Sequence, residues 1–410
     1  MLHTAERYNA SVQRAYRYRF YPTVEQAAVL ARTFGCVRYV YNRALAARAE
    51  AWSQRQERVT YVQTSAMLTA WKLEPETAWL GDVSSVPVQQ SLRHLQAAYA
   101  AFWEKRARYP RFKSRKRHRD SAEYTRSGFR WREGTLTLAK MAEPLDIRWS
   151  RPLPAGAEPS TATVSRDPAG RWHVSILIDD PTIQPLARAE AVVGIDVGLT
   201  ALATLSTGEK ITNPRHERQD RNALGRAQRS QARKQKGSHN RERARRRVAR
   251  IHARITDRRR DHLHKLTTRL VRENQTIVIE DLSVRNMVRN HSLARAISDA
   301  AWSDLRRMLE YKCAWYGRQL VAVDRFYPSS KLCSACGHLS ASMPLGVREW
   351  VCPSCGIVHD RDLNAARNLV AAGLAVIACG EGVRPSRRTA GRLPSSKQEA
   401  QPATVGIPRL

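Results

Sequence analysis

The sequence predicts a mixed α/β protein of more than one domain, and three observations support this prediction. Short apolar runs with strand periodicity, such as Thr276 to Glu280, alternate with long stretches of helical periodicity. A separate group of strand-like segments occupies residues 134–180. The chain of 410 residues is also long enough for two or three domains and a substantial core. We therefore expect an α/β domain accompanied by a helical lobe and a small β domain.

The central stretch of the α/β domain runs from Ala191 to Ile211 and has the sequence AVVGIDVGLTALATLSTGEKI. Its apolar residues alternate up to Asp196, Gly198 ends the run, and a second apolar strand follows at Ala201–Leu205. This pattern predicts a buried hairpin with one carboxylate among aliphatic side chains. Burying an ionised aspartate costs free energy unless it is paired or binds a metal. Asp196 is thus a candidate metal ligand, and a turn aspartate at a strand end is the alternative.

The charge of the chain points to a polyanionic partner. Lys and Arg number 70 against 37 acidic residues, a formal net charge of +33. Such a surplus indicates nucleic acid, because neutralising phosphates releases counterions. Membrane attachment is the competing interpretation, but the sequence has no apolar run of transmembrane length, signal peptide or lipidation motif. We therefore expect no membrane partner and a location in the cytoplasm, in association with the nucleoid.

The N-terminal half predicts a strand, then a helical lobe, then further strands. Residues Arg14–Phe20 alternate basic and aromatic side chains, and Thr23 with Gln26 has capping-box spacing for the helix that follows. Helical periodicity then continues to about residue 106. We expect a small β-barrel that begins with this first strand and resumes at 134–180, so that the helical lobe is an insertion.

Two further segments have the composition of nucleic-acid-binding surfaces. Residues 106–132 interleave basic residues with five aromatics on which bases could stack, and a solvated basic loop is the alternative. Arg218–Lys236 and Asn240–Arg272 predict two long, very basic helices broken at Gly237 and Ser238. We favour a ridge that binds the phosphate backbone over a merely solvated face. The five aromatics are Tyr109, Phe112, Tyr124, Phe129 and Trp131.

Four of the seven cysteines cluster in two Cys-x-x-Cys pairs, with fifteen residues between the pairs. Two such pairs can close a tetrahedral thiolate site with no open position, which predicts structural zinc. His338 and His359 lie nearby and are expected to be surface histidines. The other three cysteines stand alone. The predicted zinc ligands are Cys333, Cys336, Cys352 and Cys355.

Three acids each end a strand or begin a helix: Asp196, Glu280, and either Asp360 or Asp362. They are far apart in sequence, so only a fold could bring them together. Converging carboxylates are the ligands that a pair of Mg²⁺ ions needs, and such a pair supports phosphodiester hydrolysis. Together with the hairpin and the basic helices, they indicate an RNase H-like nuclease core.

The motifs resemble those of the TnpB (OrfB) proteins of bacterial insertion sequences, which are relatives of the type V CRISPR effectors. The resemblance covers about residues 14–380, in the order of the family. It rests on YRFYPTVEQ, FGCVRYVYNRAL, YPRFKSR, GIDVGLTALATLS, DHLHKL, IVIEDLSVRNM, FYPSSKLCSACG, VCPSCG and HDRDLNAARNL.

The resemblance implies an RNA-guided DNA endonuclease with a RuvC-type active site. Its partners would be a guide RNA transcribed from the end of the transposon and double-stranded target DNA beside a short adjacent motif. By matching motif positions, Asp196, Glu280 and Asp362 would be the catalytic, magnesium-binding acids. Asp362 is preferred to Asp360 because the acid of the family precedes x-Asn-Ala-Ala. Guide and target sequences are not encoded in such a protein, since base pairing selects the target.

The resemblance also implies the domain organisation. The helical lobe would be the recognition domain, the split barrel the wedge domain, and the zinc ribbon an insertion in the nuclease domain. The expected boundaries are a flexible tail at 1–13, the wedge at 14–22 and 120–188, the recognition lobe at 23–119, the RuvC domain at 189–330 and 357–378, the zinc ribbon at 331–356 and a disordered tail at 379–410.

Three alternatives remain at this stage. A nuclease-inactive, RNA-guided DNA-binding protein would share the charge and the lobes but should have a broken set of acids. A transposase that joins DNA strands is the second alternative, and single-strand transposition through a tyrosine nucleophile would need a paired His-x-His together with that tyrosine. A zinc-ribbon protein that only binds nucleic acid would leave the buried acids unexplained.

Overall fold

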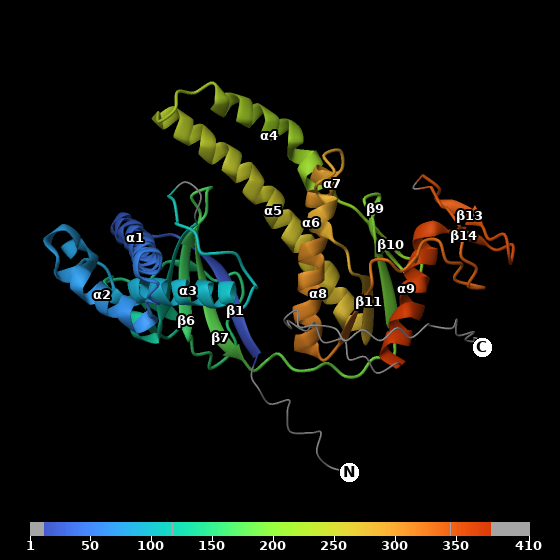
Figure 1. Ribbon diagram of the computed structural model, residues 1–410, viewed down its shortest axis with the longest axis horizontal. Coiled ribbons are helices and arrows are strands. Elements are labelled where there is room, and N and C mark those ends of the chain that lie inside the picture. Colours follow the sequence, from blue (N-terminus) through green and yellow to red (C-terminus); the bar gives the residue numbers. More distant parts are fainter. Residues whose placement is uncertain (1–11, 116–118, 345, 379–410) are drawn as a thin grey trace, which may run out of the picture.

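The computed structural model describes residues 12–115, 119–344 and 346–378. Its elements form an N-terminal group and a C-terminal group, which lie side by side and are joined by the extended segment 181–191 (Figure 1). The predicted tail at 379–410 lies outside the described residues, as does the predicted N-terminal tail up to residue 11. Within the described ranges, no helix is both long enough and apolar enough to cross a membrane.

The N-terminal group is built on a five-stranded antiparallel sheet with the order β2-β6-β7-β1-β5. Its first strand pairs along its whole length with β7, from Val12 opposite Asp180 to Phe20 opposite Trp172. The buried aromatic residues of β1, Tyr16, Tyr18 and Phe20, alternate with exposed Arg17 and partly buried Arg19, because successive side chains of a strand face opposite sides. The strands are β1 (Val12–Phe20), β2 (Asp120–Thr125), β3 (Phe129–Arg132), β4 (Thr135–Leu138), β5 (Ile147–Arg148), β6 (Thr161–Arg166) and β7 (Trp172–Asp180).

The helices of this group lie in the chain between β1 and β2. Thr23 caps the first of them, and its side chain and that of Gln26 form the predicted capping box. The helices have a core of their own, which includes Val40, Leu68 and Leu92. They are α1 (Val24–Arg55), α2 (Tyr61–Leu73), the short 3₁₀ helix η1 (Pro75–Gly81) and α3 (Ser85–Trp103), and a second 3₁₀ turn, η2 (Arg126–Gly128), follows β2.

The C-terminal group is built on a second five-stranded sheet, with the order β10-β9-β8-β11-β12. Strands β8, β11 and β12 are parallel, whereas β9 pairs antiparallel with β8 as the predicted hairpin and β10 pairs antiparallel with β9. The strands are β8 (Val192–Val197), β9 (Ala201–Leu205), β10 (Lys210–Thr212), β11 (Thr276–Glu280) and β12 (Gln319–Val323), with a separate small pair, β13 (Glu349–Val351) and β14 (Val358–Asp360).

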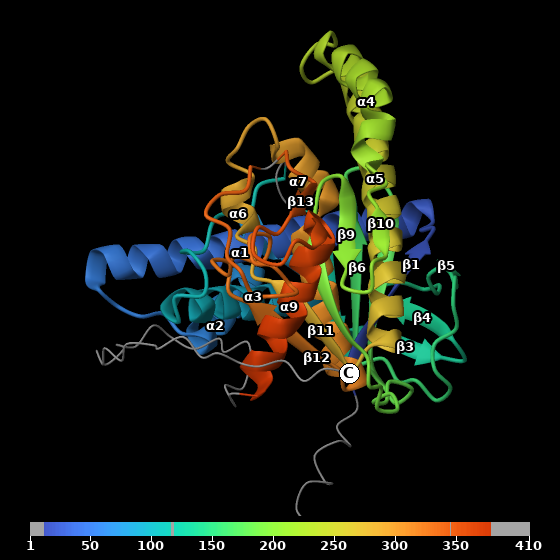
Figure 2. The ribbon, with the colours of Figure 1, turned by 90° about the vertical axis from the view of Figure 1, so that its right-hand side faces the viewer.

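Helices cover both faces of this sheet (Figures 1 and 2). Ile277 and Ile279 face a core shared with α5 and α8, whereas Val278 faces a smaller core with Leu369 of α9. This is the alternation predicted for the strand that ends at Glu280. The helices are α4 (His216–Ala232), α5 (His239–Glu273), α6 (Val284–Met287), α7 (Ala294–Ala300), α8 (Trp302–Tyr316) and α9 (Arg361–Ala378).

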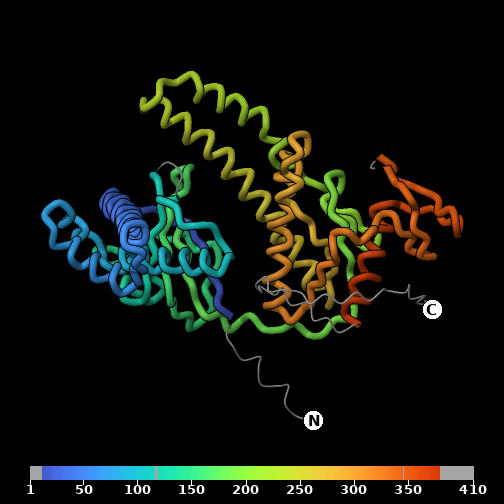
Figure 3. Tube along the Cα trace, viewed as in Figure 1, coloured from blue at the N-terminus to red at the C-terminus, as the bar shows by residue number. Residues whose placement is uncertain are grey.

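The two basic helices, α4 and α5, form an antiparallel pair that extends from the C-terminal sheet over the N-terminal group (Figure 3). The predicted break between them is present, because Gly237 has a φ of 86° and Ser238 caps α5 by accepting from the Arg241 amide. Arg171, after the β6–β7 turn, pairs with Asp257 of α5 at 2.5 Å. This ion pair connects the two groups.

Candidate active site and metal centre

Asp196 and Glu280 end two neighbouring strands of the C-terminal sheet. β8 and β11 are parallel, and Ile195 pairs with Ile279, so the acid that follows each residue lies at the same edge of the sheet. In parallel sheets, binding sites form beyond the carboxyl ends of the strands. The structure thus brings together two acids that are 84 positions apart in the sequence.

Asp362 lies in the first turn of α9, which packs directly on β8. The close approach depends on Gly194, because a Cβ at this position would overlap the carbonyl oxygen of Ala366. Gly194 lies two residues before Asp196, and Ala366 lies one turn after Asp362. The glycine therefore allows the helix to bring its first turn to the edge where Asp196 lies.

Asp196 is buried and lies within reach of the charges of the other two acids. Burial, followed by the negative charges of Asp362 and Glu280, raises the pKa of Asp196 from its ordinary 3.8 to about 8. Burial also raises the pKa of Glu280. Within the described residues, neither the Asp196 nor the Glu280 carboxylate accepts a hydrogen bond or forms an ion pair. A divalent cation bound by Asp196 and Glu280 would supply these two carboxylates with the partner that they lack among the described residues.

The neighbouring acids have different surroundings. Asp360 caps α9, since its Oδ1 accepts from the Leu363 amide at 2.9 Å, and its Oδ2 pairs with Lys210 at 2.5 Å. The bond to Lys210 contributes to an Asp360 pKa below the usual range, although burial opposes it. Asp281, next to Glu280, pairs with Arg306 and Arg325. Both acids therefore already have partners.

Arg348 is a residue that the sequence interpretation missed. Its Nη1 lies 3.3 Å from Oδ1 of Asp362, and its charge acts to lower the pKa of Asp196. The guanidinium is more than half exposed, so it is accessible from solvent. Nothing in the sequence around Arg348 distinguishes it from the many other arginines of the chain.

The four predicted zinc ligands converge. Their sulfur atoms all lie within 4.8 Å of one another, with Cys333 and Cys355 at 3.7 Å and Cys336 and Cys352 at 3.6 Å. In a tetrahedral site with Zn–S bonds of about 2.3 Å, sulfur atoms are about 3.8 Å apart. The cluster therefore fits a structural zinc ion. The two Cys-x-x-Cys knuckles are residues 331–340 and 350–357, and we call these two knuckles together the zinc module.

The expectation that His359 is a surface histidine is wrong. Its side chain is buried, packs against Trp350 in a tilted ring contact with centroids 4.9 Å apart, and places Nε2 3.0 Å from Sγ of Cys333. β14 pairs with β13, and this pairing directs the histidine toward the first knuckle. A ring nitrogen that contacts a metal-binding thiolate would orient that ligand.

The basic and aromatic segment 106–132 is divided between surface and core. Tyr109 and Phe112 are 45% and 60% exposed, as a stacking surface requires. Tyr124 is fully buried, and Phe129 and Trp131 pack against the same core. The interpretation as an exposed aromatic surface is therefore wrong for Tyr124, because β2 belongs to the N-terminal sheet.

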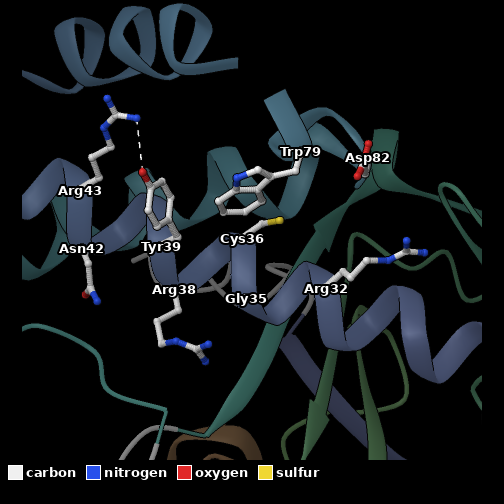
Figure 4. A pocket seen from close by; sticks show the side chains of 9 residues that line it. All are labelled: Arg32, Gly35, Cys36, Arg38, Tyr39, Asn42, Arg43, Trp79 and Asp82. Atoms are coloured by element: carbon white, nitrogen blue, oxygen red, sulfur yellow. Dashed lines mark hydrogen bonds between the residues drawn. The ribbon is translucent and has the colours of Figure 1, made fainter. Parts of the chain in front are cut away.

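The helical lobe has a pocket of about 570 Å³ on α1 (Figure 4). Tyr39 and Trp79 meet edge to face with ring centroids 5.1 Å apart, and Arg43 lies 3.4 Å from the Tyr39 hydroxyl. Arg32 and Arg38 line the same pocket. Arginines around an aromatic wall suit a nucleic-acid backbone with an unstacked base.

The fold defines the class of protein to which the chain belongs. A solved structure of a Cas12f1–sgRNA–target DNA complex superposes with a TM-score of 0.55, covering 88% of this chain and 99% of that one at 12% identity. A Cas12f1-like TNB domain model also matches residues 302–369. The chain therefore has the mixed α/β fold of a Cas12f-type protein.

The sequence comparisons then identify the family. A model of OrfB of IS605, described as "Probable transposase", matches residues 173–291. A protein of Streptomyces pristinaespiralis named "Putative RNA-guided DNA endonuclease" is 68% identical, over 97% of this chain and 99% of that one. InsQ of Escherichia coli K12, with the same description, is 34% identical over 91% and 95%. The chain belongs to the TnpB (OrfB) family.

One family model disagrees with the local structure. The helix-turn-helix domain of this family matches residues 10–57. From Val12 onward, however, this segment consists of strand β1 and the single 32-residue helix α1, with the capped start at Thr23 between them.

Proposed function

We propose that the chain is an RNA-guided DNA endonuclease. A guide RNA transcribed from the end of its mobile element would pair with double-stranded target DNA beside a short adjacent motif. The observation that supports this most is the 68% identity, over nearly the whole of both chains, to a relative with that printed name. The cytoplasm, in association with the nucleoid, is the corresponding location.

Asp196, Glu280 and Asp362 are the proposed catalytic residues. They would hold two Mg²⁺ ions, which when bound activate the attacking water and stabilise the leaving oxygen of the phosphodiester. The raised pKa of Asp196 supports this assignment, because burial and then the negative charges of Asp362 and Glu280 disfavour its ionised form, which a bound cation would favour. Arg348, beside Asp362, supplies a positive charge at the place where the scissile phosphate would approach. Asp360 and Asp281 are proposed to be structural, since both oxygens of each are engaged: Asp360 caps α9 and pairs with Lys210, and Asp281 pairs with two arginines.

The remaining surfaces would bind the nucleic acids. The formal charge of +33 supplies the electrostatic attraction, and the pair of helices α4 and α5 presents much of it as an exposed ridge. Tyr109, Phe112 and the pocket around Trp79 would receive bases and the backbone of guide or target. In this proposal, the helices of the N-terminal group are the recognition lobe and its sheet is the wedge.

The deciding experiment is to sequence the RNA that co-purifies with the protein expressed from its own element. A discrete RNA ending in sequence from outside the element is expected. A plasmid matching that sequence should then be cut in the presence of Mg²⁺, and Asp196→Ala should bind the plasmid without cutting it. Random cellular RNA would refute the proposal, and guided binding without cleavage by the unmodified protein would indicate a nuclease-inactive binder.

A further inference from the structure

Two buried asparagines of α9 form hydrogen bonds with the first zinc knuckle. Asn364 and Asn368 are 1% and 3% exposed and lie one helical turn apart on one face of the helix. Asn364 accepts from the Ser334 amide at 2.9 Å and donates to the Leu332 carbonyl at 2.7 Å. Nδ2 of Asn368 donates to the same carbonyl at 2.6 Å, and it also bonds the Ser329 carbonyl at 2.8 Å.

These bonds bracket a zinc ligand. Leu332 and Ser334 are the two neighbours of Cys333 in the chain, so the side chains of α9 fix the backbone on both sides of that cysteine. Surface asparagines would exchange such bonds with water, whereas buried amides must keep them. The first knuckle is therefore attached to α9 by directional hydrogen bonds, which would be broken if the knuckle shifted along the helix.

The same helix carries Asp362, two residues before Asn364 and without an intervening loop. The residues before the second knuckle hold this first turn from its other side. The Arg361 amide donates to the Arg348 carbonyl at 2.8 Å, and the Arg361 side chain donates to the Pro344 carbonyl at 2.7 Å. Any rearrangement of the zinc module would thus be transmitted to the turn that presents Asp362.

We propose that Asn364 and Asn368 are positioning residues that make the placement of the Asp362 carboxylate depend on zinc in the module. This inference rests on the proposed function only in taking Asp362 as a metal ligand. A small module with few apolar residues depends on its metal for its structure. Loss of zinc would free the first knuckle, the asparagine bonds would loosen, and Asp362 would no longer be aligned with Asp196 and Glu280.

The test measures Mn²⁺ affinity by electron paramagnetic resonance on the purified, RNA-free full chain, so that it does not depend on cleavage. Asn368→Ala, which removes two hydrogen bonds to the knuckle, should weaken Mn²⁺ binding about tenfold and speed zinc release to a chelator to a similar extent, as losses around metal ligands typically do. Asp362→Ala gives the affinity expected when the third acid is absent. Val376→Ala, on the same helix but two turns beyond Asn368, is the control for a general loss of packing and should change neither value.

A double-mutant cycle separates positioning from simple stabilisation. In a Cys333→Ser background, Asn368→Ala should weaken Mn²⁺ binding no further. Both changes would break the same connection, from the zinc through the first knuckle to α9 and Asp362. Additive losses, or an unchanged Mn²⁺ affinity in Asn368→Ala, would overturn the proposal. If Asn368→Ala does not fold, Asn364→Ala replaces it in the same cycle, because this variant keeps the hydrogen bonds of Asn368. Failure of the proposed function would appear separately, as absence of guided cleavage in the unmodified protein with normal Mn²⁺ binding.

Discussion

Replacing Asp196 with asparagine should stabilise the metal-free protein, and this effect should grow with pH. The pKa of Asp196 is about 8 in the folded chain against an ordinary 3.8. Between these values the unfolded chain releases the proton and the folded chain keeps it, so the free energy of unfolding falls as pH rises. An asparagine does not ionise and is free of this penalty.

The size of the effect follows from the same values. Each pH unit within this window costs at most about 1.4 kcal/mol. A carboxylate at the edge of a sheet is partly solvated, which weakens the effect of its surroundings. We therefore reduce the total loss of unfolding free energy between pH 5 and pH 8 to about 2 kcal/mol. For a domain of the size of the C-terminal group, this corresponds to a rise in Tm of about 4 to 8 °C for Asp196→Asn at pH 8.

The assay is thermal unfolding in a chelator of divalent cations, at pH 5 and pH 8, for the unmodified protein and for Asp196→Asn. The Tm difference should be small at pH 5 and large at pH 8. Adding Mg²⁺ at pH 8 should raise the Tm of the unmodified protein and have much less effect on the variant, because ligand binding to the folded state stabilises it.

Two results would refute this reasoning. A Tm difference that is the same at both pH values would show that Asp196 ionises normally and that its carboxylate is not crowded by Asp362 and Glu280. An equal effect of Mg²⁺ on both proteins would show that the cation binds elsewhere.

Three further predictions concern the third acid, the zinc module and the packing of α9. Asp362→Asn should abolish guided cleavage. Asp360→Asn keeps a good helix cap, so it should cut normally, and its free energy of unfolding should fall by no more than about 1 kcal/mol. The reverse outcome in a plasmid cleavage assay would exchange the roles of the two acids. Cys336→Ser should lower the zinc content, measured by atomic absorption, together with folding yield, and an unchanged stoichiometry would rule out the four-thiolate site. Gly194→Ala should destabilise the chain by about 2 kcal/mol, because the added Cβ overlaps the Ala366 carbonyl. An unfolding midpoint in denaturant equal to that of the unmodified protein would show that α9 does not pack on β8 as described.

Much of the local structure could be predicted from the sequence because it depends on neighbours in the chain. The capping box at Thr23, the hairpin after Asp196 and the break at Gly237 each follow from a few adjacent residues. The convergence of the four cysteines also follows from their spacing, since two Cys-x-x-Cys pairs have few ways to close a metal site.

The burial of individual side chains could not be predicted in the same way. Tyr124 and His359 lie in polar, basic stretches that suggest a surface, and both are buried. Their burial results from partners far along the chain, since β2 pairs with β6 and β14 places His359 against Cys333. The composition of the surrounding residues does not predict such distant partners.

What the sequence determined by itself was the set of chemical groups: acids at strand ends, thiolates at zinc spacing and a large excess of positive charge. What only the tertiary structure decided was which of these groups lie near one another. The parallel pairing of β8 with β11 places Asp196 and Glu280 at one edge, and Gly194 lets α9 bring Asp362 to it. The physical reason is that electrostatic and metal-binding interactions depend on distances in space, and strand pairing and helix packing set those distances between residues that are far apart in the chain.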